Sequence, residues 1–271
     1  MNKTNVVHRH MLNMQRLERS ALIRVKRCYT HQKGFIIAYL HTQPPAGWVL
    51  GLPIFFEFRI KPLWENTLKQ IWQDSIEEAE KEIRDIHSGI IKKDWQDYAD
   101  QWLKDNAGTK IDGITNTDQE WLANTLQSGL NEGKSNDEIA SDLTDDWDNM
   151  SDGRAGTIAR TEMAGSYNYA TQQTAGDLLP DDSTKIWNVT SSNPRPWHEE
   201  ADGQEVGIDE PFDVDGEDMM FPGDPSGSPE NVINCMCVVS YNINTPEENE
   251  LSPEEEESAL SEASMQLGGE E

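Results

Sequence analysis

Apolar residues recur at helical spacing between Leu63 and Ile91, and this run sets the first condition on the fold. The spacing is three to five residues throughout, and no proline interrupts it. Such a pattern traces one apolar stripe along a helix of about 3.6 residues per turn. A solvated helix of this length would leave its stripe in water, so we expect it to pack against this chain or a neighbouring subunit. The stripe consists of Trp64, Leu68, Ile71, Ile76, Ala79, Ile83, Ile86 and Ile90.

Further helices are predicted on both sides of this one. The segment His8–Arg27 is expected to form a basic amphipathic helix. Downstream, Trp95, Tyr98 and Trp102 continue a helical phase, and the tripeptide Asn106-Ala107-Gly108 is predicted to stop it. The apolar side of the first helix comprises Met11, Leu12, Leu17, Leu22 and Val25.

Three shorter helices are predicted between residues 115 and 175. Thr115 or Thr117 would cap the first, which runs to Gly129. Ser135 and Glu138 have the spacing of a capping box, so they mark the start of the second. The third is predicted to open at Ser151 and to run from residue 154 to about residue 175.

Beyond Gly176 the pattern changes from helix to strand. Strands are predicted over Thr184–Thr190, Gly203–Ile208 and Val232–Ile243, the last being the strongest. The segments 213–218 and 221–229 are predicted to be loops, because they are rich in acidic residues, glycine and proline. We therefore expect an α+β fold: a helical N-terminal part with a long amphipathic helix, followed by a small domain of helices and antiparallel strands.

Charge divides the chain into unlike regions. The net charge is −28, but residues 1–62 carry +8, residues 63–246 carry −26 and residues 247–271 carry −10. We expect four parts: a basic segment 1–62, a long amphipathic helix region 63–112, a mixed domain 113–246 and an acidic, disordered tail 247–271. The overall field repels nucleic acid. The basic segment is interpreted either as a solvated helix face or as a contact for DNA or an acidic partner.

Three cysteines are too few for a disulfide framework, and Cys235 and Cys237 are too close in sequence for an unstrained bridge. With His198 they form the chain's His/Cys constellation, and thiolate and imidazole are ligands that suit Zn²⁺. A fourth ligand would come from Asp202, Asp224, water or a neighbouring chain. On a regular strand both sulfurs would lie on one face. The alternative is that the two thiols pack in the core and His198 bonds to backbone.

Several other functions are not supported by the sequence. The acidic run 213–218 lacks the glycine and the bidentate glutamate of an EF-hand loop, so we interpret it as a turn. A His–Asn nuclease centre from His198, Asn231 and Asn234 would lack a second metal-binding histidine. The sequence has no phosphate-binding loop, dinucleotide motif or nucleophile elbow. We expect no catalytic residue and no enzyme activity. No signal peptide and no membrane-spanning segment are predicted.

Three ordered blocks carry more specific information. They are Arg154-Ala155 with Ile158–Glu162 and Asn168; Trp187 with Arg195, Trp197, His198 and Asp202–Gln204; and Pro211-Phe212 with Pro222–Pro225 and Asn234–Cys237. In this order they resemble the phage Mu F-like, SPP1 gp7-like minor head proteins of tailed phages and prophages, from about Thr115 to Tyr241. The sequence departs from that pattern at Met236, where a basic residue is usual, and before His198, where Ser192–Trp197 replaces a charged motif. The motif residues are Arg160, Glu162, Trp187, Arg195, His198, Gly203, Asn234, Cys235 and Cys237.

The resemblance implies a structural protein of the phage head. It would lie in the head interior near the portal, after synthesis in the host bacterial cytoplasm, and act in head assembly, DNA packaging or genome delivery. Its implied partners are the portal protein and other head proteins. Two other hypotheses remain open: a metal-assisted hydrolase or nuclease built on His198, Cys235 and Cys237, and a module that contacts DNA through residues 1–62. For Arg160 and Glu162 we favour a structural role, in which a buried Arg–carboxylate pair fixes a helix against the strands.

Overall fold

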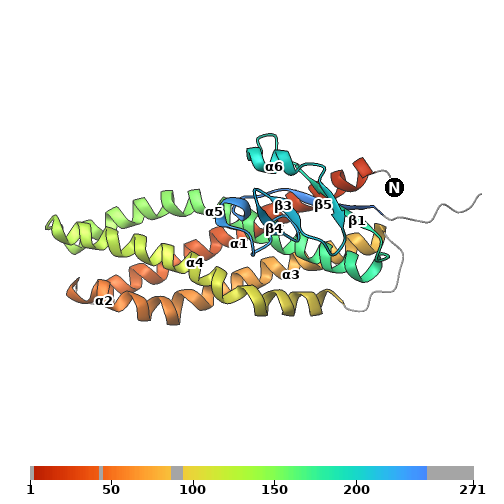
Figure 1. The fold of residues 1–271 in the computed structure, drawn as a ribbon. Helices are drawn as coiled ribbons and strands as arrows, with labels where there is room; N and C mark the ends of the chain where they lie inside the picture. Colours follow the sequence, from red (N-terminus) through yellow and green to blue (C-terminus); the bar gives the residue numbers. More distant parts are fainter. Residues whose placement is uncertain (1–2, 43–44, 87–93, 243–271) are drawn as a thin grey trace, which may run out of the picture.

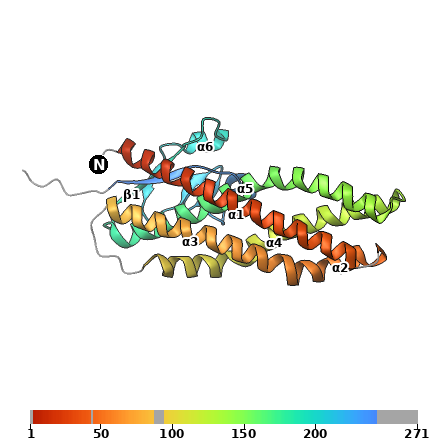
Figure 2. The same cartoon turned by 180° about the vertical axis from the view of Figure 1, so that it is seen from behind.

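Four long helical rods lie side by side in the computed structural model, which describes residues 3–42, 45–86 and 94–242 (Figure 1). Successive rods run in opposite directions, which gives the up-down-up-down order of a four-helix bundle (Figure 2). The α+β class predicted from the sequence is confirmed. The rods are α1 (Lys3–Thr42); α2 (Pro45–Phe55), continued by the π-helical turn η1 (Phe56–Ile60) and α3 (Lys61–Ile86); α4 (Trp95–Asn131); and α5 (Asn136–Leu178).

Helix α3 is the long amphipathic helix that the apolar stripe predicts. It packs against α1, α4 and α5. The part of the prediction between residues 87 and 91 lies outside the described residues. Fully buried side chains of the stripe include Trp64, Leu68, Ile71, Ile76, Ala79 and Ile83, and Trp72 joins them.

Helix α1 is longer than the predicted basic helix, and its buried face is different. Leu17 and Val25 are buried as expected, but Leu12 is 51% exposed. The buried positions are spaced to match α3 and α5, which both contact α1. The positions of α3 and α5 therefore determine which of two overlapping sets of apolar residues on α1 is buried. The buried face comprises Met14, Leu17, Ala21, Val25, Cys28, Ile36 and Leu40.

The predicted breaks in α4 and α5 are wrong. Asn106-Ala107-Gly108 lies inside α4, and the hydroxyls of Thr115 and Thr117 donate to carbonyls four residues back instead of capping a helix. A glycine inside a helix lowers helix stability by only about 1 kcal/mol. Burial of Trp102 and Ile111, on the two sides of the predicted break, contributes more than this. The expected boundary at residues 112 and 113 therefore falls inside one helix.

Helix α5 begins where the sequence predicts. Ser135 is its N-cap, and Glu138 completes the predicted capping box. Ser151 does not open a further helix, because α5 runs through it and its hydroxyl donates to the carbonyl of Asp148. The three predicted short helices are therefore parts of two long ones. The first is the end of α4, the other two belong to α5, and the turn at residues 132–135 joins the two helices.

The remaining described residues form a small β unit. An antiparallel sheet has the order β2-β1-β5, and β3 and β4 form a separate hairpin. The strands predicted at 184–190 and 203–208 are confirmed in shortened form. The bounds are β1 (Thr184–Asn188), α6 (Pro196–Ala201), β2 (Glu205–Gly207), β3 (Phe212–Val214), β4 (Glu217–Met219), α7 (Pro229–Val232) and β5 (Val238–Asn242).

Two of the predictions for the β unit are wrong. The segment 213–218 contains the predicted turn, with Asp215 and Gly216 at φ 55° and 79°, but the residues on both sides of the turn pair as a β-hairpin instead of forming a loop. The predicted strand 232–243 is extended only from Val238, because α7 occupies its first residue and Asn234 adopts φ 63°. Cys235 and Cys237 therefore lie in a loop and not on a strand.

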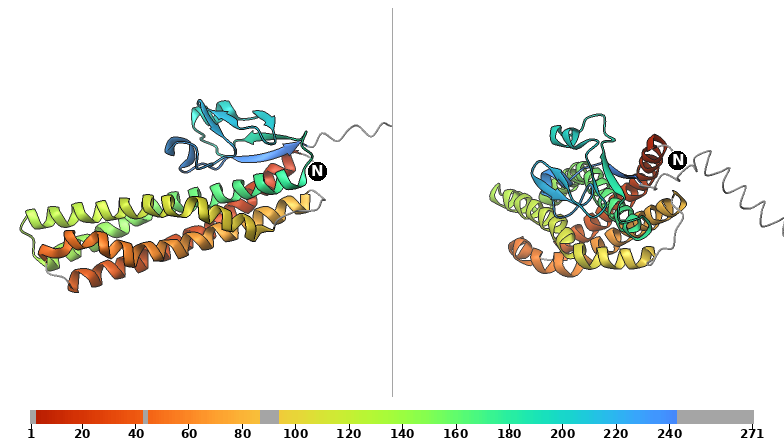
Figure 3. Two further views of the ribbon diagram at one scale, coloured as in Figure 1. Left: turned by 60° about the horizontal axis from the view of Figure 1, so that its bottom comes forward. Right: turned by 45° about the vertical axis from the view of Figure 1, so that its right-hand side comes forward.

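The β unit lies on the bundle through β5, which contacts α1 and α5 (Figure 3). Asn168 of α5 donates from Nδ2 to the carbonyls of Pro222 and Cys237, at 3.0 Å each. Gly223 has φ 81°, and a Cβ there would stand 3.0 Å from the Cα of Gly165 on α5. Glycine at both positions lets loop and helix backbones touch.

None of the helices within the described ranges is both long and apolar enough to cross a membrane. The acidic tail predicted over 247–271 lies outside those ranges.

Candidate functional site

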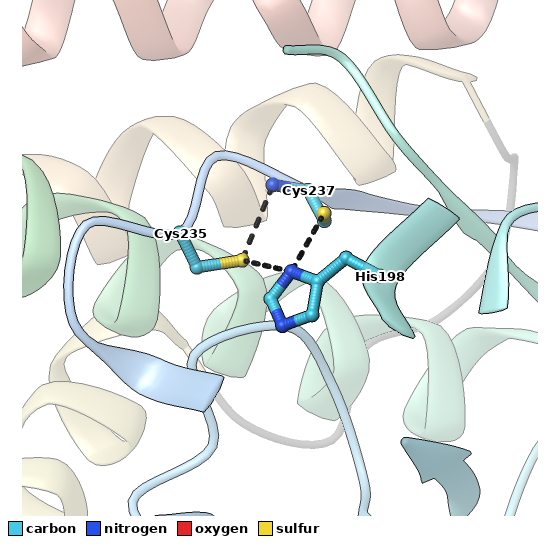
Figure 4. Close-up of side chains that lie close together, drawn as sticks. All are labelled: His198, Cys235 and Cys237. Carbon is cyan, nitrogen blue, oxygen red and sulfur yellow. Dashed lines mark hydrogen bonds between the residues drawn. The ribbon is translucent and has the colours of Figure 1, made fainter. Parts of the chain in front are cut away.

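His198, Cys235 and Cys237 meet where the β unit faces the bundle (Figure 4). His198 Nδ1 lies 3.8 Å from Cys235 Sγ and 3.6 Å from Cys237 Sγ. All three residues are at most 3% exposed. The histidine comes from α6 and the cysteines from the loop before β5, so residues nearly 40 positions apart converge here. Among the residues that the structure describes, they form the one cluster with the geometry of a metal site.

Contacts from α5 hold the cysteine loop in place. The backbone N–H of Asn234 donates to Thr161 Oγ1 at 2.9 Å, and Arg160 Nη1 donates to Asn234 Oδ1 at 2.7 Å. The left-handed backbone of Asn234 turns the chain between α7 and the cysteines. Two motif residues predicted from the sequence, Arg160 and Asn234, therefore position Cys235 through the loop that precedes β5.

Asn231 fixes the orientation of the imidazole, and sequence reasoning missed this role. Its Oδ1 lies 3.3 Å from His198 Nε2 and accepts a 2.5 Å hydrogen bond from Trp197 Nε1. Its Nδ2 donates to the carbonyl of Val214 and to Glu217 Oε2, so the oxygen of the amide must face the histidine. His198 therefore donates from Nε2 and turns the lone pair of Nδ1 to the two sulfurs. Asn231 lies three residues before Asn234, but no periodic signal marks it.

The two thiols of the cluster have unequal proton affinities. A hydrogen bond from the Cys237 thiol, helped by His198, outweighs burial and lowers the pKa of the Cys235 thiol below its usual range. The same bond and burial raise the pKa of Cys237 well above its usual range. The backbone N–H of Cys237 also lies 3.4 Å from Cys235 Sγ. Within the pair, Cys235 therefore loses its proton more readily than Cys237. By contrast, burial raises the pKa of Cys28, which lies on α1 beside Thr67, to about 12.

Three further motif residues form the walls of the cluster. The ring of Trp187 meets His198 edge-on, with centroids 5.6 Å apart. Gly203, at φ 80°, donates its N–H to the carbonyl of Trp187. Arg195 precedes α6 and donates to the carbonyl of Ile233. These contacts pin α6 and the cysteine loop to β1.

Glu162 lies in the bundle, apart from the cluster. It is 5% exposed, accepts a 3.0 Å hydrogen bond from Trp72 Nε1 and forms a 3.1 Å ion pair with Lys110. Arg160 pairs with Glu18 of α1 instead of with a buried carboxylate near the strands. The two residues thus tie α5 to α1, α3 and α4.

The two carboxylates considered as a fourth metal ligand are engaged elsewhere. Asp202 accepts from the N–H of Val189, and Asp224 accepts from those of Met220 and Ser226. Neither belongs to the His/Cys cluster. A cavity opens beside the cluster instead, and its lining includes Arg160, Ser191, Asn193, Pro194, Arg195 and Met236.

Ion pairs within the bundle use most of the positive charge of the basic segment. Six of its ten Lys and Arg side chains pair with carboxylates, most of which lie on α3, α4 and α5. The charge asymmetry of the sequence therefore has a role inside the fold. The six are Arg9, Arg16, Arg24, Lys26, Lys33 and Lys61.

Comparisons with known proteins agree with the resemblance read from the motif blocks. The model of the family described as "Phage Mu protein F like protein" matches residues 120–240. This segment contains the C-terminal part of α4, all of α5 and almost all of the β unit. A Bacillus subtilis (strain 168) protein named "Uncharacterized protein YqbB" is 30% identical over 208 residues, which cover 74% of this chain and 66% of that protein. No solved structure matches. Residues 120–240 therefore resemble the phage Mu protein F like family, and this resemblance suggests a part in phage head morphogenesis.

Proposed function

We propose that the protein is a minor head protein: a low-copy component of the procapsid or virion that binds the portal from the head interior. There it acts in head assembly, DNA packaging or genome delivery. The observation that carries the proposal is the family match, because it covers the junction between bundle and β unit where the motif residues gather. The other head proteins are its proposed neighbours.

The contacts of the motif residues support a structural role. Arg160 binds Glu18 and Asn234, Glu162 binds Lys110, and Gly203 binds a backbone carbonyl. Each contact joins two parts of the fold, so these residues stabilise its architecture. A structural protein of an assembly needs such a fixed body more than it needs a catalytic residue.

An apolar surface at the far end of the bundle supports a protein partner. Leu50, Ile54 and Phe58 are 83%, 68% and 74% exposed. They are spaced four residues apart on α2 and η1, so they face a similar direction. This end of the bundle lies away from the strands (Figure 1). Large apolar side chains gathered on one exposed face are typical of protein interaction sites. We assign the portal contact to this stripe, Leu50–Ile54–Phe58.

Co-expression with the portal protein of the same phage tests this assignment. The full chain should co-purify with portal rings, and the double variant Leu50→Asp/Ile54→Asp should lose most of that binding while remaining folded. Ile23→Asp is the matched control, because Ile23 is 60% exposed on α1, outside the stripe, and should bind as the parent does. Unchanged binding of the double variant would refute the stripe as the contact, and a parent chain that never binds portal would refute the portal association.

A further inference from the structure

The cluster of His198, Cys235 and Cys237 has a geometry that simple core packing does not require. We propose that these three residues bind a zinc ion, through Nδ1 of the imidazole and the Sγ atoms of the two cysteines. The proposal concerns the β unit alone and does not depend on the proposed role in the phage head.

The interatomic distances match those around a tetrahedral zinc ion. Bonds of about 2.3 Å to sulfur and about 2.0–2.1 Å to nitrogen, at the tetrahedral angle, separate a sulfur from the nitrogen by about 3.6 Å. The distances from His198 Nδ1 are 3.6 Å to Cys237 and 3.8 Å to Cys235. The ligand atoms all lie within 4.8 Å of one another. Two sulfurs bound to one zinc ion are expected to be about 3.8 Å apart, which lies within this limit. Both nitrogen–sulfur distances therefore lie within a few tenths of an ångström of the separation expected at zinc.

The two sulfurs of the cluster both face one nitrogen of the imidazole. A neutral imidazole that donates from Nε2 has a single lone pair on Nδ1, yet two sulfurs face it. One thiol can donate to that lone pair while the other donates to the first sulfur, and only one of the two sulfurs then contacts the lone pair. A metal ion at the centre uses the lone pair of the nitrogen and both sulfurs at once.

The surroundings of His198 resemble the environment of a metal-bound histidine. Such histidines almost always donate their other ring N–H to a carbonyl, a carboxylate or water, which fixes the ring and raises its basicity. Asn231 Oδ1 has this position, and Glu217 in turn holds Asn231 through a 2.8 Å bond to Nδ2. This chain of contacts from β4 through α7 to α6 is built from buried or half-buried groups.

The types of ligand select zinc over the hard divalent ions. Thiolates suit Zn²⁺, whereas Mg²⁺ and Ca²⁺ require oxygen ligands. Zinc bound to two thiolates is electrically balanced, which removes the cost of burying a charged sulfur. The N–H of Cys237, 3.4 Å from Cys235 Sγ, adds a donor to one of these thiolates.

A cavity beside the cluster leaves room for a fourth ligand. His198, Cys235 and Cys237 all line that cavity, together with the polar side chains of Ser191 and Asn193. Asp202 and Asp224 already accept hydrogen bonds from backbone amides, so we assign the fourth position to a water molecule. The bound ion would join α6 to the loop before β5 and so fasten both sides of the β unit.

Metal analysis of the full chain tests the proposal. Protein purified without chelator and freed of any affinity tag should contain about one zinc per chain. Cys235→Ser and Cys237→Ser should each lose most of it, and His198→Asn should weaken binding strongly. Cys28→Ser is the matched control, because Cys28 is an equally buried free thiol outside the cluster and its loss should leave zinc content unchanged.

Cobalt substitution provides a second measurement that needs no variant. Co²⁺ added to metal-free parent protein should give the thiolate-to-cobalt charge-transfer absorption and the visible bands of a tetrahedral site. A folded parent chain that contains no zinc and gives no such absorption would overturn the proposal. Zinc retained in full by a Cys235→Ser/Cys237→Ser double variant would overturn it too, because the ion would then lie elsewhere.

Discussion

The helical bundle and the β unit are stabilised by different kinds of contact. The bundle buries long periodic stripes, such as that of α3, and adds ion pairs such as Arg24–Asp74 between α1 and α3. The β unit has short strands, and single polar contacts hold it together, among them those of Asn168 and Asn231. A bundle of this kind tolerates the loss of any one surface contact, whereas the β unit depends on particular side chains. The family match covers almost all of the β unit, but of the bundle only α5 and the end of α4.

A charge inside the bundle should have the largest effect on stability. Ile76 is fully buried on α3, so Ile76→Asp places an unpaired carboxylate in the core and should lower the free energy of unfolding by at least about 4 kcal/mol, or prevent folding. The matched control is Ile54→Asp in the same rod, where the side chain is 68% exposed and the change should be within about 0.5 kcal/mol. Urea denaturation measures both. Equal effects in the two variants would mean that the stripe of α3 is not the core.

Loss of one polar contact should loosen the β unit while the bundle stays intact. Asn168→Ala leaves the carbonyls of Pro222 and Cys237 without this donor and should cost about 1–3 kcal/mol. Hydrogen exchange should become faster in β1 and β5 and remain slow in α3, because parts of a protein can open separately. The control is Asn106→Ala, whose amide bonds only to a carbonyl of its own helix, that of Trp102. If exchange rose equally throughout the chain, the two regions would form one cooperative unit.

A buried lysine should give the β unit its own dependence on pH. Burial lowers the pKa of Lys185 on β1 to about 8, against the pull of Asp209, Asp224 and Glu210. In the unfolded chain this lysine keeps its proton up to about pH 10.4. Between about pH 8 and pH 10.4 the unfolded state therefore binds more protons than the folded state, so stability should rise with pH across this window. The variant Lys185→Met should remove the rise in denaturation midpoints measured from pH 7 to pH 10.

The bundle should respond at the acidic end of the pH scale. Burial alone would raise the pKa of Glu82 on α3, but hydrogen bonds with His10, Tyr167 and Asn13 lower it below the ordinary value. A lowered carboxyl pKa stabilises the fold above about pH 4.3, the value in the unfolded chain, and this stability is lost as pH falls through the folded value. Glu82→Gln should therefore flatten the acid limb of the stability curve and leave the alkaline limb unchanged. An alkaline limb that also changed would contradict the separation of the two groups.

Periodic features of this chain could be predicted, and features set by single contacts could not. The stripe of α3 and the capping box at Ser135 are local patterns, and both are confirmed. Gly108 and Ser151 also carry local signals, but burial on both sides of each position outweighs a preference of about 1 kcal/mol. The side of α1 that is buried depends on where α3 and α5 lie, and the sequence of α1 alone does not contain that information.

In the His/Cys cluster, too, some features could be predicted from the sequence and others could not. Residue chemistry alone suggests that His198, Cys235 and Cys237 belong together, and the structure brings them within 4.8 Å. The reason inferred from the sequence, a regular strand, is wrong, because Asn234 turns the loop and Arg160 holds it. The role of Asn231 in orienting the imidazole could not be predicted, since only the folded chain places its amide between Trp197 and His198.

The role in the phage head is tested most directly by quantitative mass spectrometry of purified procapsids and virions. We predict that this chain is present in procapsids, in fewer copies than the major capsid protein and in a fixed ratio to the portal protein. Detection only in the cytoplasm of infected or induced cells, and never in purified particles, would contradict the proposed function.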